Sequence, residues 1–487
     1  MRPSNLLFIL SDEHQRDIAG CYGDHLAITP NIDRLAAGGV RFTNAYTPCP
    51  ICVPARAALA TGRWVHQCKA WDNAAPYHGE LASWHHRLRE GGHRVASIGK
   101  LHFRSTEDDN GFSEEILPLH VLEGKGDLIG MLREPPPARG SMPALAESAG
   151  AGESDYNDYD RDITAAACRW IADMAERKAG KPWALFVSLV RPHFPLTAPP
   201  EFFALYPPER MPMPRLYNEA GRPRHPAITA LRGIMNYDDF FQDAASVRRA
   251  IASYYALVSY LDDNIGKILK ALAAAGLADT TRIIYTSDHG DNLGCRGMWG
   301  KSVMYEESAA ISLIMAGPDV PSSAVVETPV SLIDCYRTAI ECTGCPLPAA
   351  DAALPSRSLW EIAAGAQPDR NVLSEYHAAG SITGSFMIRH GRWKYVHHVG
   401  FRPELFDLKA DPGETRDLAE QPDMVPVLAE CEAQLRRICD PEEVSAEAFA
   451  DQRRSIAAYG GADAIKKRGD YSYTPAPGEK PVLVVKT

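Results

Sequence analysis

The sequence lacks the features of a membrane protein and of a nucleic-acid-binding protein. None of its apolar runs approaches the roughly 20 consecutive residues that a membrane-spanning helix needs. It has 51 Lys and Arg against 62 Asp and Glu, which gives a formal net charge of −11. Because nucleic acids and anionic membranes repel such a surface, we expect neither as a partner.

We expect neither a signal peptide nor a disulfide framework. The apolar run 6–10 is too short for the core of a signal peptide and is soon followed by Asp12 and Glu13. The 11 cysteines are odd in number and scattered over 487 residues, which is typical of reduced thiols. We therefore expect a cytoplasmic protein.

Short apolar, β-rich runs alternate with helical segments through about the first 340 residues. This alternation predicts an α/β fold with a mostly parallel central sheet flanked by helices. The clearest helix covers residues 247–275, where apolar residues recur every three or four positions until Gly276. The predicted strands are 6–10, 95–98, 183–189, 282–286 and 311–315.

Two stretches interrupt this pattern, and the texture changes after about residue 370. Residues 106–160 are polar and rich in Gly and Pro, and we expect a long surface excursion that could cover a site. Residues 207–243 are either a rim of that site, an oligomer contact or disordered. We expect residues 1–370 to form the α/β domain and 371–487 a smaller α+β subdomain with an antiparallel sheet, a helix and a tail.

Polar side chains follow four of the predicted strands. Because ligands of parallel α/β sheets bind outside the carboxyl ends of the strands, these side chains are expected at one edge. A single Asp after a strand is more often a cap or turn residue, but four such endings together favour a site. Carboxylates and imidazole suit Ca²⁺, Mn²⁺ or Mg²⁺. The residues concerned are Asp12 and Glu13, Lys100 and His102, Arg191 and His193, and Asp288, His289 and Asp291.

The stretch "CPICVPARAALATGR" combines a Cys-x-x-Cys pair with the pentad Cys52-Val53-Pro54-Ala55-Arg56. Pro54 suits the first turn of a helix and Gly62 its end, so Cys52 is predicted at a helix N-terminus, where an anion is favoured. Arg56, one turn on, adds a planar donor. A zinc or redox pair with Cys49 is the alternative; zinc would need two further ligands, and Cys342 and Cys345 lie in a different context.

The pentad and an ordered set of further motifs resemble the type I sulfatases of the alkaline phosphatase superfamily. The likeness spans residues 5 to about 420 and implies a sulfuric ester hydrolase, arylsulfatase-like, whose cysteine is oxidised to formylglycine by a dedicated enzyme. The motifs are "NLLFILSDEH", "TPNIDRLAAGGVRFTNAYT", "SIGKLHF", "RPHFP", "YTSDHGDNLG" and "ELFDLKADPGETRDLA".

Roles for the site residues follow from the resemblance alone. It implies a divalent metal, Ca²⁺ or Mn²⁺ and less readily Mg²⁺, and a hydroxyl of the hydrated aldehyde at position 52 that attacks sulfur. The metal ligands would be Asp12, Cys52 once modified, Asp288 and His289. Lys301 and His193 would act on the leaving alcohol, His102 would accept the proton that expels sulfate, and Arg56 and Lys100 would hold the nucleophile and the sulfuryl oxygens.

Several points of the resemblance stay open. The Asp288-His289 pair resembles the branch of choline sulfatases and phosphonate monoester hydrolases, and Glu13 replaces an Asp that is a ligand in many sulfatases. Asn73 is either a substrate contact or a turn residue. Phosphonate monoester hydrolases lack the lysine and the histidine that this chain has in "GKLHF", so the resemblance implies sulfate esters as substrates. Phosphonate monoesters or phosphodiesters are the alternative. A homodimer or homotetramer is expected.

Overall fold

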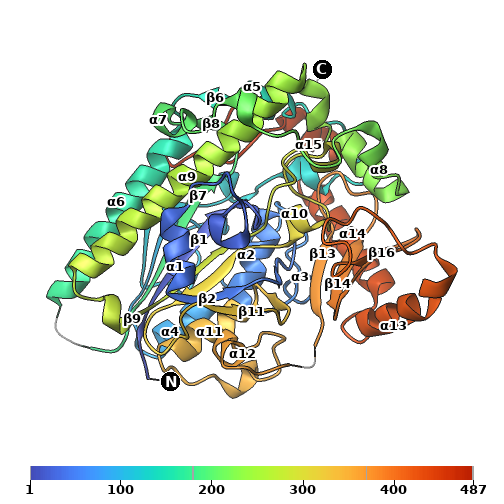
Figure 1. Cartoon of the computed structure of the whole chain (residues 1–487). Helices are drawn as coiled ribbons and strands as arrows, with labels where there is room; N and C mark the ends of the chain where they lie inside the picture. The colour runs from blue at the N-terminus through green and yellow to red at the C-terminus, as the bar shows by residue number, and fades with distance from the viewer. Residues whose placement is uncertain (1, 178–179, 369, 485–487) are drawn as a thin grey trace.

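The structure is a computed structural model that describes residues 2–177, 180–368 and 370–484. Its centre is an eight-stranded sheet in the order β11-β2-β10-β9-β1-β7-β4-β5 (Figure 1). β1 runs parallel to β7 and β9, and β4 runs parallel to β7 and β5. The strands of this sheet are β1 (Asn5–Asp12), β2 (Gly39–Phe42), β4 (Val95–Lys100), β5 (Glu114–Leu119), β7 (Ala184–Pro192), β9 (Thr281–Ser287), β10 (Leu313–Ala316) and β11 (Ala324–Val326).

Helices cover both faces of the sheet, so the predicted α/β class is confirmed. The long helices α6 and α9 lie side by side over one face together with α1 (Figure 1). The other face packs against α2, α4, α11 and α12. These helices are α1 (Pro30–Ala37), α2 (Cys52–Thr61), α4 (Trp84–Glu90), α6 (Asp155–Glu176), α9 (Ala244–Ala274), α11 (Asp334–Cys342) and α12 (Leu359–Ala363).

The central strand β1 shows why the run 6–10 forms a buried strand. Side chains alternate between the two faces of a strand, and here both faces are apolar. Leu6, Phe8 and Leu10 join the core under α2 and α4, whereas Leu7 and Ile9 join the core under α6 and α9. All five side chains are fully buried. The strand is therefore fixed from both sides, and with it the residues that follow it.

The other predicted elements are confirmed with small shifts of their ends. The predicted helix 247–275 is α9, and Gly276 ends it with a φ of 67°, a left-handed conformation that glycine adopts readily. The predicted strand 311–315 is β10, which runs antiparallel to both of its neighbours.

The two irregular stretches are folded against the body of the protein. Residues 106–160 include β5, α5 (Pro143–Glu147), β6 (Gly150–Ala151) and the start of α6, and β6 pairs with β8 (Thr197–Ala198). Residues 207–243 contain α8 (Pro226–Ile234). The remaining short elements lie elsewhere in the chain before residue 370. They are the helices α3 (Val65–Cys68), α7 (Pro200–Phe203) and α10 (Glu306–Ala309) and the strand pair of β3 (Ala45–Tyr46) with β12 (Val330–Ser331).

After residue 370 the chain forms a second sheet, four-stranded and antiparallel, drawn in orange to red in Figure 1. Gly391 makes the predicted turn between β14 and β15. The predicted helix near 425–438 is α13, whereas α14 and α15 carry no counterpart in the prediction. The elements are β13 (Val372–Tyr376), β14 (Ser385–His390), β15 (Trp393–His398), β16 (Glu404–Asp407), α13 (Val425–Arg436), α14 (Pro441–Ala458) and α15 (Ala462–Arg468).

Among the residues that the structure describes, no helix combines the length and the apolar character needed to cross a bilayer.

Candidate active site

The carboxyl ends of β1 and β9 place two carboxylates at the same level. Ser11 of β1 pairs with Ser287 of the parallel strand β9, so Asp12 and Asp288 leave the sheet together. The backbone amide of His289 donates a 2.9 Å hydrogen bond to Asp288 Oδ1, which fixes that carboxylate. All of these side chains are fully buried. The predicted convergence of strand ends therefore occurs at the two central strands.

Helix α2 brings Cys52 to this edge from the face of the sheet that it covers. The helix begins at Cys52 after an extended Ile51 and ends at Gly62, whose φ is 66°. Every residue of α2 is buried, because its small Ala side chains allow close packing against the sheet. The thiol is thus held at a helix N-terminus, as predicted.

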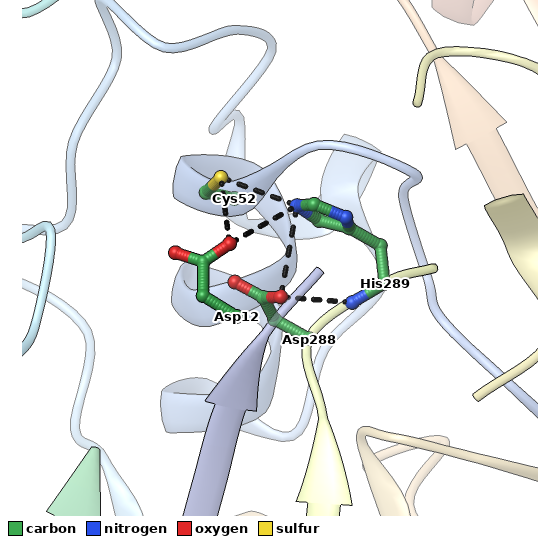
Figure 2. Close-up of side chains that lie close together, drawn as sticks. All are labelled: Asp12, Cys52, Asp288 and His289. Carbon is green, nitrogen blue, oxygen red and sulfur yellow. Dashed lines mark hydrogen bonds and ion pairs between the residues drawn. The ribbon is translucent and has the colours of Figure 1, made fainter. Parts of the chain in front are cut away.

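Four side chains point toward one another in this arrangement (Figure 2). Cys52 Sγ lies 3.5 Å from Asp12 Oδ1 and 3.1 Å from His289 Nε2. His289 Nε2 in turn lies 3.8 Å from Asp12 Oδ1 and 3.6 Å from Asp288 Oδ1. Ligands of a Ca²⁺ ion at right angles are about 3.3–3.7 Å apart. The predicted metal ligands Asp12, Cys52, Asp288 and His289 are thus brought within coordinating range of one another.

The tautomer of His289 indicates that a cation fits between these groups. Its Nδ1 lies 3.0 Å from the carbonyl oxygen of Gly290 and donates to it, so in the neutral ring Nε2 carries a lone pair. That lone pair faces the carboxylate oxygens of Asp12 and Asp288. Three lone-pair donors that converge in a buried place repel one another unless a cation lies between them. The donor set therefore fits a hard divalent metal.

Buried cations surround the two carboxylates. Arg56 Nε donates to Asp288 Oδ2 at 2.8 Å and an Arg56 terminal nitrogen reaches Asp12 at 3.4 Å, while Lys100 forms an ion pair with Asp12. Burial opposes the charge of Asp12, but the cations Lys100 and Arg56 outweigh burial and hold the pKa of Asp12 well below the ordinary range. Asp12 is thus an anion, the form in which a carboxylate binds a metal.

The guanidinium of Arg56 donates its hydrogen bonds to buried groups of the protein. Besides the two carboxylates it donates to the carbonyl oxygen of Lys100 at 2.8 Å and to Ser188 Oγ at 2.9 Å. Its side chain is 2% exposed, and it does not line the pocket that Cys52, Lys100 and Lys301 line. This geometry supports a role in holding Asp12 and Asp288 rather than in touching a substrate.

Glu13 contacts two other predicted residues, and one of its carboxylate oxygens also lies within 4.8 Å of an oxygen of Asp12. Lys301 Nζ donates to Glu13 Oε2 at 2.8 Å, and His193 Nε2 lies 3.4 Å from the same oxygen. Burial raises the pKa of Glu13 well above its ordinary range, although Lys301 opposes this. Residue 13 takes a left-handed backbone with a φ of 67°, which turns its side chain out of the strand's alternation.

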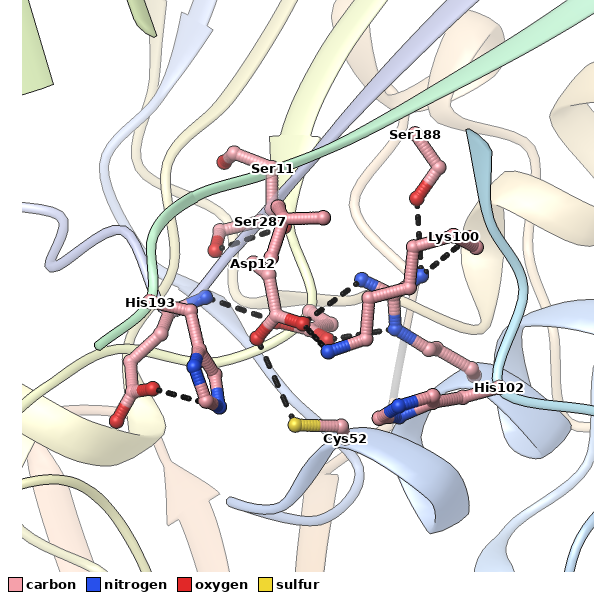
Figure 3. Close-up of polar contacts among 12 residues, drawn as sticks. Ser11, Asp12, Cys52, Lys100, His102, Ser188, His193 and Ser287 are labelled. Carbon is pink, nitrogen blue, oxygen red and sulfur yellow. Dashed lines mark hydrogen bonds and ion pairs between the residues drawn. The ribbon is translucent and has the colours of Figure 1, made fainter. Parts of the chain in front are cut away.

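Two histidines flank Cys52. In the view of Figure 3, His193 lies on one side of Cys52 and His102 lies on the other, near Lys100. Burial lowers the pKa of both imidazoles well below the ordinary value, aided at His102 by Lys100 and at His193 by Lys301. Both rings line the same pocket as Cys52, Lys100 and Lys301.

Asn73 is the remaining predicted site residue. Its Oδ1 accepts a 3.2 Å hydrogen bond from the backbone amide of Val53, the residue after Cys52. It also lines the pocket. Asn73 therefore satisfies a free amide at the start of α2 and lies beside the position that would react.

Several pocket residues were not foreseen. Some come from the excursion 106–160, and four come from the tail after α15, although no sequence motif marked them. They are Val121, Asp127, Arg139, Ser141, Met142, Tyr156, Tyr471, Ser472, Tyr473 and Thr474. Arg191, by contrast, is fully buried away from the pocket and bonds the carbonyl oxygens of His193 and Pro195.

Glu375 of β13 lies outside the pocket. It is fully buried and accepts from the ring of His66 at 2.8 Å and from that of His377 at 3.3 Å. It ties α3 to β13. Burial opposes its charge, but His66 and His377 outweigh burial and lower its pKa to about 2.

We expect Glu375→Gln to destabilise the protein in a pH-dependent way. A carboxylate whose pKa is lowered in the folded protein stabilises the fold at pH values above its unfolded pKa of 4.5. This contribution is lost as the pH falls toward 2, where the folded protein also becomes protonated. His66, whose pKa is raised, is charged below 6.5. The gap in melting temperature between wild type and variant should therefore be widest between pH 4.5 and 6.5, corresponding to about 3 kcal/mol, and narrow below that window. A gap that widens as the pH falls would contradict this account.

Comparison with known proteins places this geometry among hydrolases. Residues 4–345 match the Sulfatase family, and residues 294–440 match the family described as N-sulphoglucosamine sulphohydrolase, C-terminal. The choline-sulfatase of Rhizobium meliloti is 31% identical over 425 residues, 86% of this chain and 83% of that protein. Arylsulfatase K of Homo sapiens is 25% identical over 446 residues, 85% of this chain and 78% of that protein.

Solved structures share the fold over almost the whole chain. The phosphonate monoester hydrolase of Agrobacterium radiobacter has a TM-score of 0.71 at 24% identity, covering 91% of this chain and 96% of that one. BT4656, solved with its substrate D-glucosamine-2-N,6-O-disulfate, has a TM-score of 0.72 at 21% identity, covering 92% of this chain and 99% of that one.

Proposed function

The chain belongs to the sulfatase family, it is a sulfuric ester hydrolase, and we propose that it works through a formylglycine made from Cys52 and one divalent metal. Asp12, Asp288 and His289 would hold the metal together with the modified residue. Convergence of these three donors on Cys52 Sγ is the observation that carries the proposal. Here Sγ stands in for an oxygen of the modified side chain.

Each of the two groups supplies one kind of chemistry when present. The metal supplies positive charge beside the reacting oxygen and sulfur, which lowers the pKa of the nucleophile. The formylglycine supplies a hydroxyl nucleophile that thiol chemistry lacks. Ca²⁺ and Mn²⁺ both suit two carboxylates and an imidazole, and Mg²⁺ suits them less because it dehydrates reluctantly and usually keeps several water ligands.

The chain's own cations bind the sulfuryl group. Lys100 and Lys301 lie in the pocket with Cys52, and Lys100 is anchored through its ion pair with Asp12. Burial opposes the charge of Lys301, but the acidic groups around it, Asp12 among them, outweigh burial and raise its pKa well above the ordinary range, so it stays a cation. These fixed charges stabilise the negative charge that builds on the sulfuryl oxygens.

Two histidines move the protons. The ring of His193 donates from Nδ1 to the carbonyl oxygen of Phe194 at 2.6 Å, so its Nε2, which lies near Glu13 and Lys301, must itself be protonated before it can give a proton to the leaving alcohol. His102, with Thr474 against its Nε2, would accept the proton released when sulfate departs. We also propose that Arg56 positions Asp12 and Asp288, and that Asn73 contacts the substrate.

The organisation of the protein around this site is a further part of the proposal. We propose a catalytic unit over residues 1–370 and a subdomain over 371–487. A formylglycine-generating enzyme would act on Cys52 during maturation, and a homodimer or homotetramer would be the working form. The 11 cysteines are free thiols, which supports the cytoplasm as the compartment.

Sulfate esters should be preferred over phosphonate monoesters. A sulfate monoester carries three terminal oxygens on sulfur, and the pocket offers three sources of positive charge, namely Lys100, Lys301 and the proposed metal site. A phosphonate monoester has two such oxygens and a bulky carbon substituent. We expect kcat/KM for an aryl sulfate to exceed that for the matching aryl phosphonate monoester by at least about tenfold. Choline sulfate should be assayed in parallel, and a clear preference for the phosphonate would support the alternative hydrolase.

A further inference from the structure

Residues 470–474, which follow α15, form one wall of the catalytic pocket. Tyr471, Ser472, Tyr473 and Thr474 line it together with Cys52. The aromatic ring of Tyr473 lies 4.9 Å from that of Tyr156, centre to centre. The segment comes from the end of the chain, far in sequence from Cys52, yet it lines the same cavity. Its contacts show how it is held there.

Asp470 anchors the segment. Its carboxylate accepts from the guanidinium of Arg139 at 2.5 and 3.3 Å and from the hydroxyl of Ser141 at 2.7 Å. Arg139 also donates to Asp127 at 2.7 and 3.1 Å, so one buried cation joins two carboxylates. Burial opposes the charge of Asp470, but Arg139 outweighs it and lowers its pKa. The Arg139–Asp470 pair therefore clamps residue 470 to the excursion 106–160.

Thr474 ends the segment with two hydrogen bonds. The hydroxyl of Tyr156 donates to its carbonyl oxygen at 2.5 Å, which fixes the backbone. The side-chain Oγ1 lies 3.1 Å from His102 Nε2, a contact between residues 372 positions apart in the chain. Within the described part of the chain, Nδ1 of His102 has no hydrogen-bond partner. Thr474 Oγ1 is therefore the group that fixes the orientation of this ring.

We propose that Thr474 is a positioning residue for His102, and that the Arg139–Asp470 pair holds it in place. The inference rests on the proposed function, in which His102 moves a proton. Residue 102 has a left-handed backbone with a φ of 54° and follows the end of β4, so its own strand does not set the ring. A ring that is held in one rotamer reaches its proton without first losing rotational freedom.

A pair of substitutions separates the hydroxyl of Thr474 from its bulk. Thr474→Val keeps the shape of the side chain and removes the hydrogen bond, whereas Thr474→Ser keeps the hydroxyl and removes a methyl group. We expect the valine variant to lose about tenfold to hundredfold in kcat with KM changed by less than about threefold. The serine variant should recover kcat to within about threefold of wild type.

A matched control and an activity-independent measurement complete the test. Thr328→Val removes an exposed hydroxyl that bonds Gln367 Oε1, and it should leave kcat and KM unchanged. Reaction of His102 with diethyl pyrocarbonate, measured on the tryptic peptide 101–104 by mass spectrometry, should be faster in Thr474→Val than in wild type or Thr474→Ser. Asp470→Asn should speed hydrogen exchange at the amide of residue 470, which bonds the carbonyl oxygen of Val484.

The outcomes distinguish this inference from the proposed function. Wild-type kcat and unchanged His102 modification in Thr474→Val would overturn it, as would equal losses in the valine and serine variants, because bulk rather than the hydroxyl would then matter. If wild type hydrolyses no sulfate ester, the proposed function fails instead. The modification rates would still report whether Thr474 holds the ring, and an unchanged rate would overturn that contact.

Discussion

Cys52→Ala is expected to abolish sulfate-ester hydrolysis while leaving the fold intact. Removing a covalent nucleophile lowers kcat by about 10⁴-fold or more, because the remaining groups can bind the substrate but none of them attacks its sulfur atom. Cys52 is 2% exposed at the start of α2, and alanine fits the same place. The melting temperature should therefore change little. The measurement is kcat for an aryl sulfate on protein produced together with the modifying enzyme.

Cys49→Ala is the matched control for this variant. Cys49 lies three residues earlier, is fully buried and belongs to an apolar cluster outside the catalytic pocket. Replacing Cys49 by alanine removes packing contacts but no group that reacts, so kcat should stay within about twofold of wild type. Equal losses in the two variants would contradict the assignment of Cys52 and would revive a role for the cysteine pair.

Asp12→Asn is expected to remove both metal and activity. The change replaces a buried anion that faces His289 Nε2 and Cys52 Sγ and leaves the charge of Lys100 without its partner. Loss of a ligand carboxylate should lower metal affinity by at least about 10–100-fold and kcat/KM by about 10³-fold. Metal content of the purified protein, measured by inductively coupled plasma mass spectrometry, should fall from one ion per chain to a small fraction.

Glu13→Gln provides the comparison, because Glu13 is the neighbouring carboxylate in the same chain segment. Its Oε2 contacts Lys301 and His193. The glutamine variant should keep the wild-type metal content and change only the kinetics of ester hydrolysis. Loss of metal from Glu13→Gln, or full metal content in Asp12→Asn, would contradict the assigned ligand set.

Much of the fold could be predicted from residue pattern because the central strands are apolar on both faces. The run 6–10 and the helix around Ile265 are fixed by burial alone, which sequence periodicity reports directly. The antiparallel direction of β10 could not be predicted, because a buried strand reads the same in either direction. The structure of residues 106–160 could not be predicted either, because it depends on tertiary contacts rather than on a periodic sequence pattern.

The candidate site also contains residues that could be predicted from the sequence and residues that could not. Asp12 and Asp288 could be placed together because they end neighbouring parallel strands, and Cys52 because Pro54 and Gly62 mark the ends of its helix. The clamp of Asp470 could not be foreseen. It depends on a buried Arg139 in an irregular stretch, and no periodicity connects the two positions.

The most direct test of this account is mass spectrometry of the tryptic peptide 42–56 from active enzyme treated with a thiol alkylating reagent. The peptide contains Cys49 and Cys52 and ends at Arg56. The account predicts an alkylated cysteine at position 49 and, at position 52, a lighter residue that resists alkylation and reacts with an aldehyde probe. A fully active enzyme in which both positions carry alkylated cysteine would contradict it.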